Sequence, residues 1–114
     1  MIRSTIRLVL APEKEYEVQQ ILQSLVERIR AEAGCQGCSI YKDTGKAHTI
    51  IFEERWRSEE DLQRHLRSNE YRKVLLAMEM GVEPPEIMFD TVTSTRGVET
   101  IKKARTNKRG CTSS

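Results

Sequence analysis

The hydrophobic pattern changes its period within the first thirty residues, and this change constrains the fold more than any other feature. From Ile2 to Leu10, alternate residues are mostly aliphatic, which predicts a β-strand with one apolar face. After Pro12, apolar residues recur every three or four positions, which predicts an amphipathic helix of about five turns that Gly34 ends. The helix stripe consists of Val18, Ile21, Leu22, Leu25, Val26 and Ile29.

Two more strands are predicted after this helix. Residues 38–42 form a short strand, and residues 48–56 are rich in β-branched and aromatic side chains. Between them, Asp43 to Lys46 supplies the residues of a hairpin turn. Pro84 and Pro85 then force an extended approach to a fourth strand at residues 87–93.

A second helical region is predicted at residues 58–80. Ser58 lies three residues before Asp61, as in a capping box, and Ser68 is placed to cap a new helix that interrupts the region. Its buried side is expected to contain Leu62, Leu66, Val74, Leu75 and Met78. The resulting order is β-α-β-β-α-β, so we predict an α+β, ferredoxin-like fold.

In this fold, helices cover only one face of the sheet. The apolar residues of the first and third strands predict that both faces are apolar, with Trp56 on the uncovered face. A second sheet from another subunit is the simplest cover, so we expect a homodimer. The residues behind this prediction are Ile2, Ile6, Leu8, Ile50, Phe52 and Trp56.

The charge of the chain is unevenly distributed. Residues 1–95 hold 13 Lys and Arg against 16 Asp and Glu, a balance of −3. Residues 96–114 hold six basic residues and one acidic residue, a balance of +5. We therefore predict one domain at 1–95 and a basic, flexible tail at 96–114, with a short helix around residues 99–105. Because the folded body is mildly acidic, nucleic-acid binding is not expected.

The compartment and the metal content follow from what the sequence lacks. The chain opens in strand-like alternation rather than with a leader, and no apolar run approaches the roughly 20 residues of a membrane span. We therefore expect a cytoplasmic protein that does not contact membranes. Cys35 and Cys38 have the spacing of half a zinc site, but no second pair exists, so they are expected to be ordinary thiols without a metal, with redox or metal chemistry as the alternative.

Two polar residues are candidates for catalysis: His65 on the second helical region and Glu54 on the third strand. His65 borders the apolar side of the second helical region, where an imidazole can transfer protons near neutral pH. The alternative is a packed histidine that bonds a backbone carbonyl or a strand carboxylate. Glu54 shares a strand face with Trp56, and its carboxylate needs a partner: Arg7, Arg55 of the partner subunit, or His65. Glu54 is then either part of a structural ion pair or a base that takes a phenolic proton.

Trp56 is the main candidate for ligand contact, because indole offers a flat face and one N–H donor. The alternative is packing in the core or in the dimer interface. Tyr71 is expected either at the pocket mouth or packed at the helix junction. The rest of the predicted pocket is apolar with one hydroxyl and consists of Phe52, Ile50, Ile6 and Ser4.

These residues form a pattern with their neighbours. Glu54 and Trp56 lie on a strand, Ser58 at a turn, and Leu62, His65, Ser68 and Tyr71 follow on the helical region. Together with the turn at 33–35 and the approach at 84–87, this pattern resembles the antibiotic biosynthesis monooxygenase family. The resemblance covers residues 1–95 and implies a dimeric alpha-beta barrel.

The resemblance also implies a chemistry. Some members of the family oxidise polycyclic phenols with O2 without a cofactor, and the aromatic residue equivalent to Trp56 lines their cavity. Heme-degrading relatives use a histidine and an asparagine where this chain has Leu75 and Ile6, and no flavin or nicotinamide fingerprint is present, so no cofactor is expected. We predict a monooxygenase-like protein acting on a small aromatic or quinol compound. The alternative is a non-catalytic dimer of the same fold that binds a small metabolite.

Overall fold

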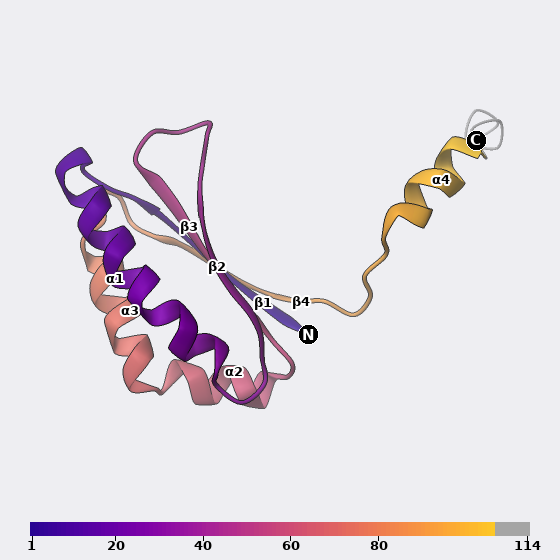
Figure 1. Cartoon of the computed structure of the whole chain (residues 1–114), viewed down its shortest axis with the longest axis horizontal. Helices are drawn as coiled ribbons and strands as arrows, with labels where there is room; N and C mark the ends of the chain where they lie inside the picture. Colours follow the sequence, from indigo (N-terminus) through magenta and orange to yellow (C-terminus); the bar gives the residue numbers. More distant parts are fainter. Residues whose placement is uncertain (107–114) are drawn as a thin grey trace.

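The computed structural model describes residues 1–106, which form a four-stranded sheet with helices packed on one face (Figure 1). No helix in this part of the chain is long and apolar enough to cross a membrane. The elements are β1 (Ile2–Val9), α1 (Pro12–Arg30), β2 (Cys35–Lys42), β3 (Thr49–Trp56), α2 (Glu59–Leu66), α3 (Asn69–Glu79), β4 (Glu86–Thr91) and α4 (Val98–Thr106).

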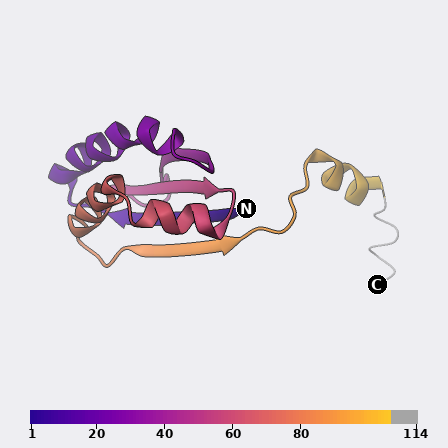
Figure 2. The ribbon, with the colours of Figure 1, turned by 90° about the horizontal axis from the view of Figure 1, so that it is seen from below.

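The strand order is β2-β3-β1-β4, and every neighbouring pair is antiparallel. The predicted α+β, ferredoxin-like fold is therefore confirmed. β2 begins three residues earlier than predicted, at Cys35, and β4 covers Glu86–Thr91 instead of 87–93. Figure 1 shows the sheet edge-on with the helices to one side, and Figure 2 shows the strands spread out with β4, in orange, at the edge of the sheet.

The six apolar residues from which two apolar faces were predicted all lie on the face that the helices cover. In the antiparallel register, the even-numbered residues of β1 pair with even-numbered residues of β3, and directly paired residues share a face. The prediction of two apolar faces, with Trp56 on the uncovered one, is therefore wrong. The pairs are Ile2 with Trp56, Ile6 with Phe52, and Leu8 with Ile50, and all six side chains are buried.

The two helices predicted from Ser58 and Ser68 form as expected. The Ser58 side chain accepts a hydrogen bond from the Asp61 N–H, and the Ser68 side chain accepts one from the Tyr71 N–H. These caps separate α2 from α3 and let the chain turn between them. One residue of the predicted buried side is exposed: Leu75 has 45% of its surface exposed, because α3 is buried through Tyr71, Val74 and Ala77.

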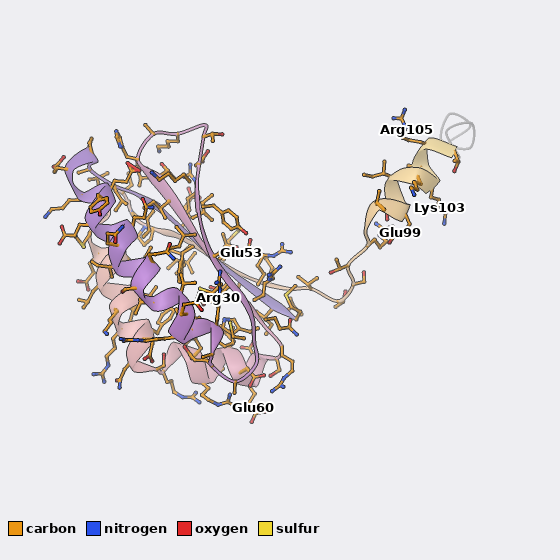
Figure 3. All side chains as sticks on the ribbon, viewed as in Figure 1. Arg30, Glu53, Glu60, Glu99, Lys103 and Arg105 are labelled. Atoms are coloured by element: carbon orange, nitrogen blue, oxygen red, sulfur yellow. The ribbon has the colours of Figure 1, made fainter. Side chains whose placement is uncertain are left out.

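The last elements extend beyond the body of the molecule. β4 pairs only with β1, and all its residues are exposed. An extended segment then leads to α4, which Figures 1 and 3 show well away from the sheet, together with its labelled Lys103 and Arg105. The short helix predicted near residues 99–105 is confirmed at Val98–Thr106. Cys111 lies outside the described residues.

Candidate active site

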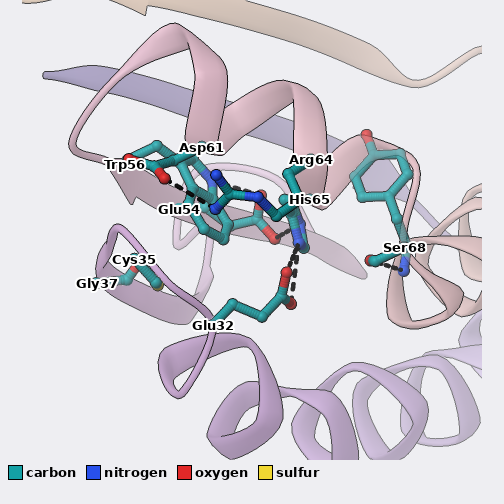
Figure 4. A network of polar contacts seen from close by, with 10 residues as sticks. Glu32, Cys35, Gly37, Glu54, Trp56, Asp61, Arg64, His65 and Ser68 are labelled. Atoms are coloured by element: carbon teal, nitrogen blue, oxygen red, sulfur yellow. Dashed lines mark hydrogen bonds and ion pairs between the residues drawn. The ribbon is translucent and has the colours of Figure 1, made fainter.

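The candidate site lies between the end of β3 and the helices that cover it. β3 supplies Glu54 and Trp56, α2 supplies His65, and α3 supplies Tyr71 at its first turn. Glu32, which the sequence did not single out, comes from the turn between α1 and β2. Figure 4 shows Glu32, Glu54 and Trp56 gathered around the imidazole of His65.

His65 bridges two carboxylates through its two ring nitrogens. Its Nε2 lies 2.8 Å from Glu54 Oε2, and its Nδ1 lies 3.0 and 3.1 Å from the two carboxylate oxygens of Glu32. The other oxygen of Glu54 accepts a 3.3 Å hydrogen bond from the indole N–H of Trp56. Of the partners that the sequence allowed for Glu54, the structure selects His65.

Two aromatic rings enclose the imidazole. The Trp56 ring stacks on His65 with centroids 4.4 Å apart and planes inclined by 28°, and Tyr71 meets His65 edge-on at 5.2 Å. Trp56, His65 and Glu54 have no exposed surface, and Tyr71 is also buried. The Glu32 side chain remains 23% exposed, so it links the buried network to solvent.

The surroundings of His65 favour its protonated form. Burial lowers the pKa of His65, but the hydrogen bonds and charges of Glu54 and then Glu32 outweigh burial, so the net pKa is raised from 6.5. Burial also raises the pKa of the Tyr71 phenol, and the charge of Glu54 adds to this effect. The site thus holds an imidazole whose protonated form is favoured beside a phenol that keeps its proton.

The other predicted site residues lie along the same covered face. Ser4 pairs directly with Glu54 across β1 and β3 and is fully buried, and its hydroxyl has no hydrogen-bond partner among the described protein groups. Ile6 and Phe52 form the next pair of this face. Ile50 lies four residues from Glu54 along β3, beside Leu8, so it is part of the core further from His65.

His48, Cys35 and Cys38 lie outside this network. His48 is exposed and bonds Glu15 at 2.8 Å. Cys35 and Cys38 are free thiols, and burial raises the pKa of both, which keeps them protonated and unreactive. Within residues 1–106, no group of three His, Cys, Asp or Glu side chains is placed to hold a metal ion.

Comparison with known proteins identifies the family of this fold. The family model described as antibiotic biosynthesis monooxygenase matches residues 1–75. The chain belongs to the antibiotic biosynthesis monooxygenase family. This match includes the whole Glu32, Glu54, Trp56, His65 and Tyr71 network, and it confirms the resemblance seen in the sequence.

Solved structures agree with the fold. A proposed antibiotic biosynthesis monooxygenase from Deinococcus radiodurans superposes with a TM-score of 0.76 at 17% identity, over 85% of this chain and 97% of that one. A conserved protein from Methanosarcina mazei Go1 superposes with a TM-score of 0.73 at 27% identity, over 78% of this chain and 89% of that one. At 17% identity, the first likeness shows the fold alone.

One curated relative is similar in sequence. An uncharacterized protein from Synechocystis is 27% identical over 86 residues, which cover 75% of this chain and 58% of the relative. The chain thus matches somewhat more than half the length of that relative. These comparisons establish the family of the chain and its monooxygenase-like fold.

Proposed function

We propose that this family member is a cofactor-independent monooxygenase that acts on a small aromatic or quinol compound. In this proposal, Glu54 and His65 transfer the proton of a phenolic hydroxyl, and Trp56 and Phe52 contact the ring. Ser4 and Tyr71 contribute hydroxyl groups at its edge. Ile6 and Ile50 keep the site apolar. The family match and the monooxygenase-like fold support the reaction class.

The observation that carries the proposal is the buried chain of carboxylate, imidazole and carboxylate. Burying two ionisable groups in the core of a small domain costs several kcal/mol per ion before their attraction is counted. Hydrophobic side chains of the same volume would stabilise the core at least as well. A network that connects the interior to the exposed Glu32 is therefore better explained by proton transfer than by stability.

The network can remove a proton in two steps. Glu54 accepts the phenolic proton, which neutralises the carboxylate that favours the protonated form of His65. His65 then releases its Nδ1 proton to Glu32 and from there to solvent. The electron-rich phenolate left behind is oxidised by O2, so that a phenol and O2 yield a quinone and water. Ser4 is placed to hydrogen-bond the substrate oxygen, since its hydroxyl lies beside Glu54 without a partner.

A second candidate function is supported by the closed state of the site. Trp56, Glu54 and His65 have no exposed surface, so a ligand can enter only if α2 moves away from the sheet. Such a closed site also suits a protein that binds a small metabolite without catalysing a reaction. Its buried ion pair would then fix the position of α2 on the sheet.

Oxygen uptake with a panel of phenols and quinols separates these functions. The proposal predicts O2 consumption above the buffer rate, with one quinone formed per O2. It also predicts quenching of Trp56, the single tryptophan of the chain, by the same compounds. Quenching without O2 uptake would support the binding function, and neither quenching nor uptake across the panel would refute the enzymatic proposal.

We also propose a homodimer that works in the cytoplasm. Its structural support is now β4, which exposes Ile87, Met88 and Phe89 on its two faces. An exposed edge strand with apolar side chains tends to associate with another chain. A partner subunit would cover it and the open face of the sheet.

A further inference from the structure

A pocket lies at the edge of the sheet formed by β2, and none of its lining residues belongs to the Glu54 and His65 network. Its volume is about 380 Å³, which is within the range of roughly 300–1,000 Å³ that small-molecule sites occupy. It is formed where the end of α1 crosses the edge strand β2 and where β2 pairs with β3. The lining residues are Arg30, Cys35, Gln36, Gly37, Cys38, Ser39 and Arg55.

Arg30 is fixed over the edge of β2. Its Nε and Nη2 donate hydrogen bonds of 3.0 and 2.9 Å to the carbonyl oxygen of Cys38, and its Nη1 pairs with Glu27 at 2.9 Å. The guanidinium therefore satisfies a backbone carbonyl of the edge strand. It also brings positive charge to the rim of the pocket.

Arg55 is the unpaired cation of the pocket. Arg7, Arg30, Arg57 and Arg64 each form an ion pair with a carboxylate, whereas Arg55 forms none among the described residues. Its direct cross-strand partner on β1 is another arginine, Arg3. Arg3 has Asp90 of β4 directly opposite it on its other side, whereas the Arg55 guanidinium lies over Gly37 of β2 without a carboxylate partner among the described residues.

The backbone below Arg55 is adapted to its guanidinium. Gly37 is the partner of Arg55 on β2, and a Cβ at Gly37 would overlap the guanidinium group. The ladder shifts register between Cys35 and Gly37, so Gln36 has no partner on β3. A bulged residue of this kind leaves its backbone groups free for other contacts. The glycine and the bulge thus create the space that the pocket occupies.

We propose that this pocket binds the oxyanion group of a small molecule, either a carboxylate or a phosphate. Arg55 would bind two oxygens of the group side by side, the geometry that a guanidinium forms with planar or tetrahedral oxyanions. The Ser39 hydroxyl adds a donor from the strand, while the charge of Arg30 at the rim is balanced by Glu27. Because residues 1–95 carry a net charge of −3, the attraction for an anion is local to this pocket.

Titration of the full chain with inorganic phosphate and with succinate at low salt tests the site by 1H–15N NMR. For at least one anion, saturable shifts are expected at the amides of residues 36–39 and at the Nε–H of Arg55. The two titrations distinguish a phosphate site from a carboxylate site. Shifts spread evenly over the surface arginines, or no shifts in this pocket, would overturn the proposal, including the case in which a partner subunit fills it.

Two variants probe the pocket with matched controls. Gly37→Ala keeps every charge but displaces the Arg55 guanidinium, and Arg55→Gln removes the charge; each is expected to weaken anion binding at least tenfold. Gly45→Ala in the β2–β3 turn is the control for Gly37→Ala, and Arg72→Gln on α3 is the control for Arg55→Gln. Both control variants should bind the anion with native affinity. Native affinity in both Gly37→Ala and Arg55→Gln would contradict the assignment.

Discussion

At the scale of single residues, His65 shows how neighbours decide the chemistry of a side chain. Its position in the sequence allowed either a proton-transfer group or a packed histidine that bonds a carboxylate, and the structure places the ring between two carboxylates. The imidazole is fully buried, which lowers its pKa, but its contacts with Glu54 and Glu32 outweigh burial and raise it. The same contacts that fix the ring in place also prepare it to carry a proton.

The raised pKa of His65 predicts how stability depends on pH. Because the folded chain binds this proton more tightly than the unfolded chain, the stabilising contribution is complete below pH 6.5 and is lost as the pH rises through the folded pKa. Urea unfolding from pH 6 upward should therefore show a falling free energy of unfolding. His65→Asn should flatten this slope, and an unchanged slope would show that His65 is not the responsible group.

Ser4 gives a second prediction at this scale. A buried hydroxyl without a partner costs about 1–3 kcal/mol, so Ser4→Ala should leave the melting temperature unchanged or raise it. The same change should weaken the binding of a phenol that quenches Trp56, because the substrate loses a hydrogen bond. A marked loss of stability in Ser4→Ala, measured by thermal unfolding, would mean that the hydroxyl already has a structural role.

At the scale of elements, the turn after α1 contacts the start of α2 and fixes its position. Gly34 has φ +82°, and its carbonyl accepts a hydrogen bond from the Arg57 N–H. Asp61, in the first turn of α2, is buried and pairs with Arg57 and Arg64. A Cβ at Gly34 would overlap the Asp61 carboxyl, so this turn requires glycine for two reasons.

Gly34→Ala should therefore destabilise the fold strongly. The left-handed backbone alone costs an alanine about 1–2 kcal/mol, and displacement of Asp61 adds to this. We expect the melting temperature to fall by roughly 5–15 °C, given about 4–8 °C per kcal/mol for a small domain. Gly45→Ala serves as the control, since Gly45 lies in a turn without a positive φ. Equal melting temperatures for the two variants would refute this account of the turn.

Local patterns explain why most elements were predictable from the sequence. The changes of period at Pro12 and the serine caps at Ser58 and Ser68 act within a few residues, so the strands and helices followed from them. The face on which Trp56 lies did not follow, because alternation shows that a strand has two sides but not which side the helices cover. Glu32 was missed because it lies 33 residues from His65, and only the folded topology brings them together.

At the scale of the whole molecule, β4 is an edge strand that leaves apolar side chains exposed to solvent. α1 and the α2–α3 pair cover β1, β2 and β3, whereas β4 lies at the edge with its apolar side chains exposed (Figure 2). The extended segment that follows carries α4 away from the body (Figure 1). Both features suit a chain whose C-terminal part contacts a second copy.

Light scattering at micromolar concentration should therefore report a dimer. Phe89→Glu and Met88→Glu should each shift the population towards monomer, because a charge would be buried in the interface. Leu76→Glu on α3 replaces another exposed apolar residue and should leave the dimer intact. A stable monomer for the native chain would refute the proposed dimer.

The central claim is that Glu54 and His65 transfer the substrate proton, and steady-state O2 uptake tests it most directly. With a compound that the native chain oxidises, Glu54→Gln and His65→Asn should each lower kcat by about 10²–10⁴-fold, the usual contribution of acid–base groups. KM should change much less. His48→Asn, which alters the exposed histidine, should keep native kcat. If His65→Asn and Glu54→Gln retain native kcat and lose only stability, the network is structural and the claim is wrong.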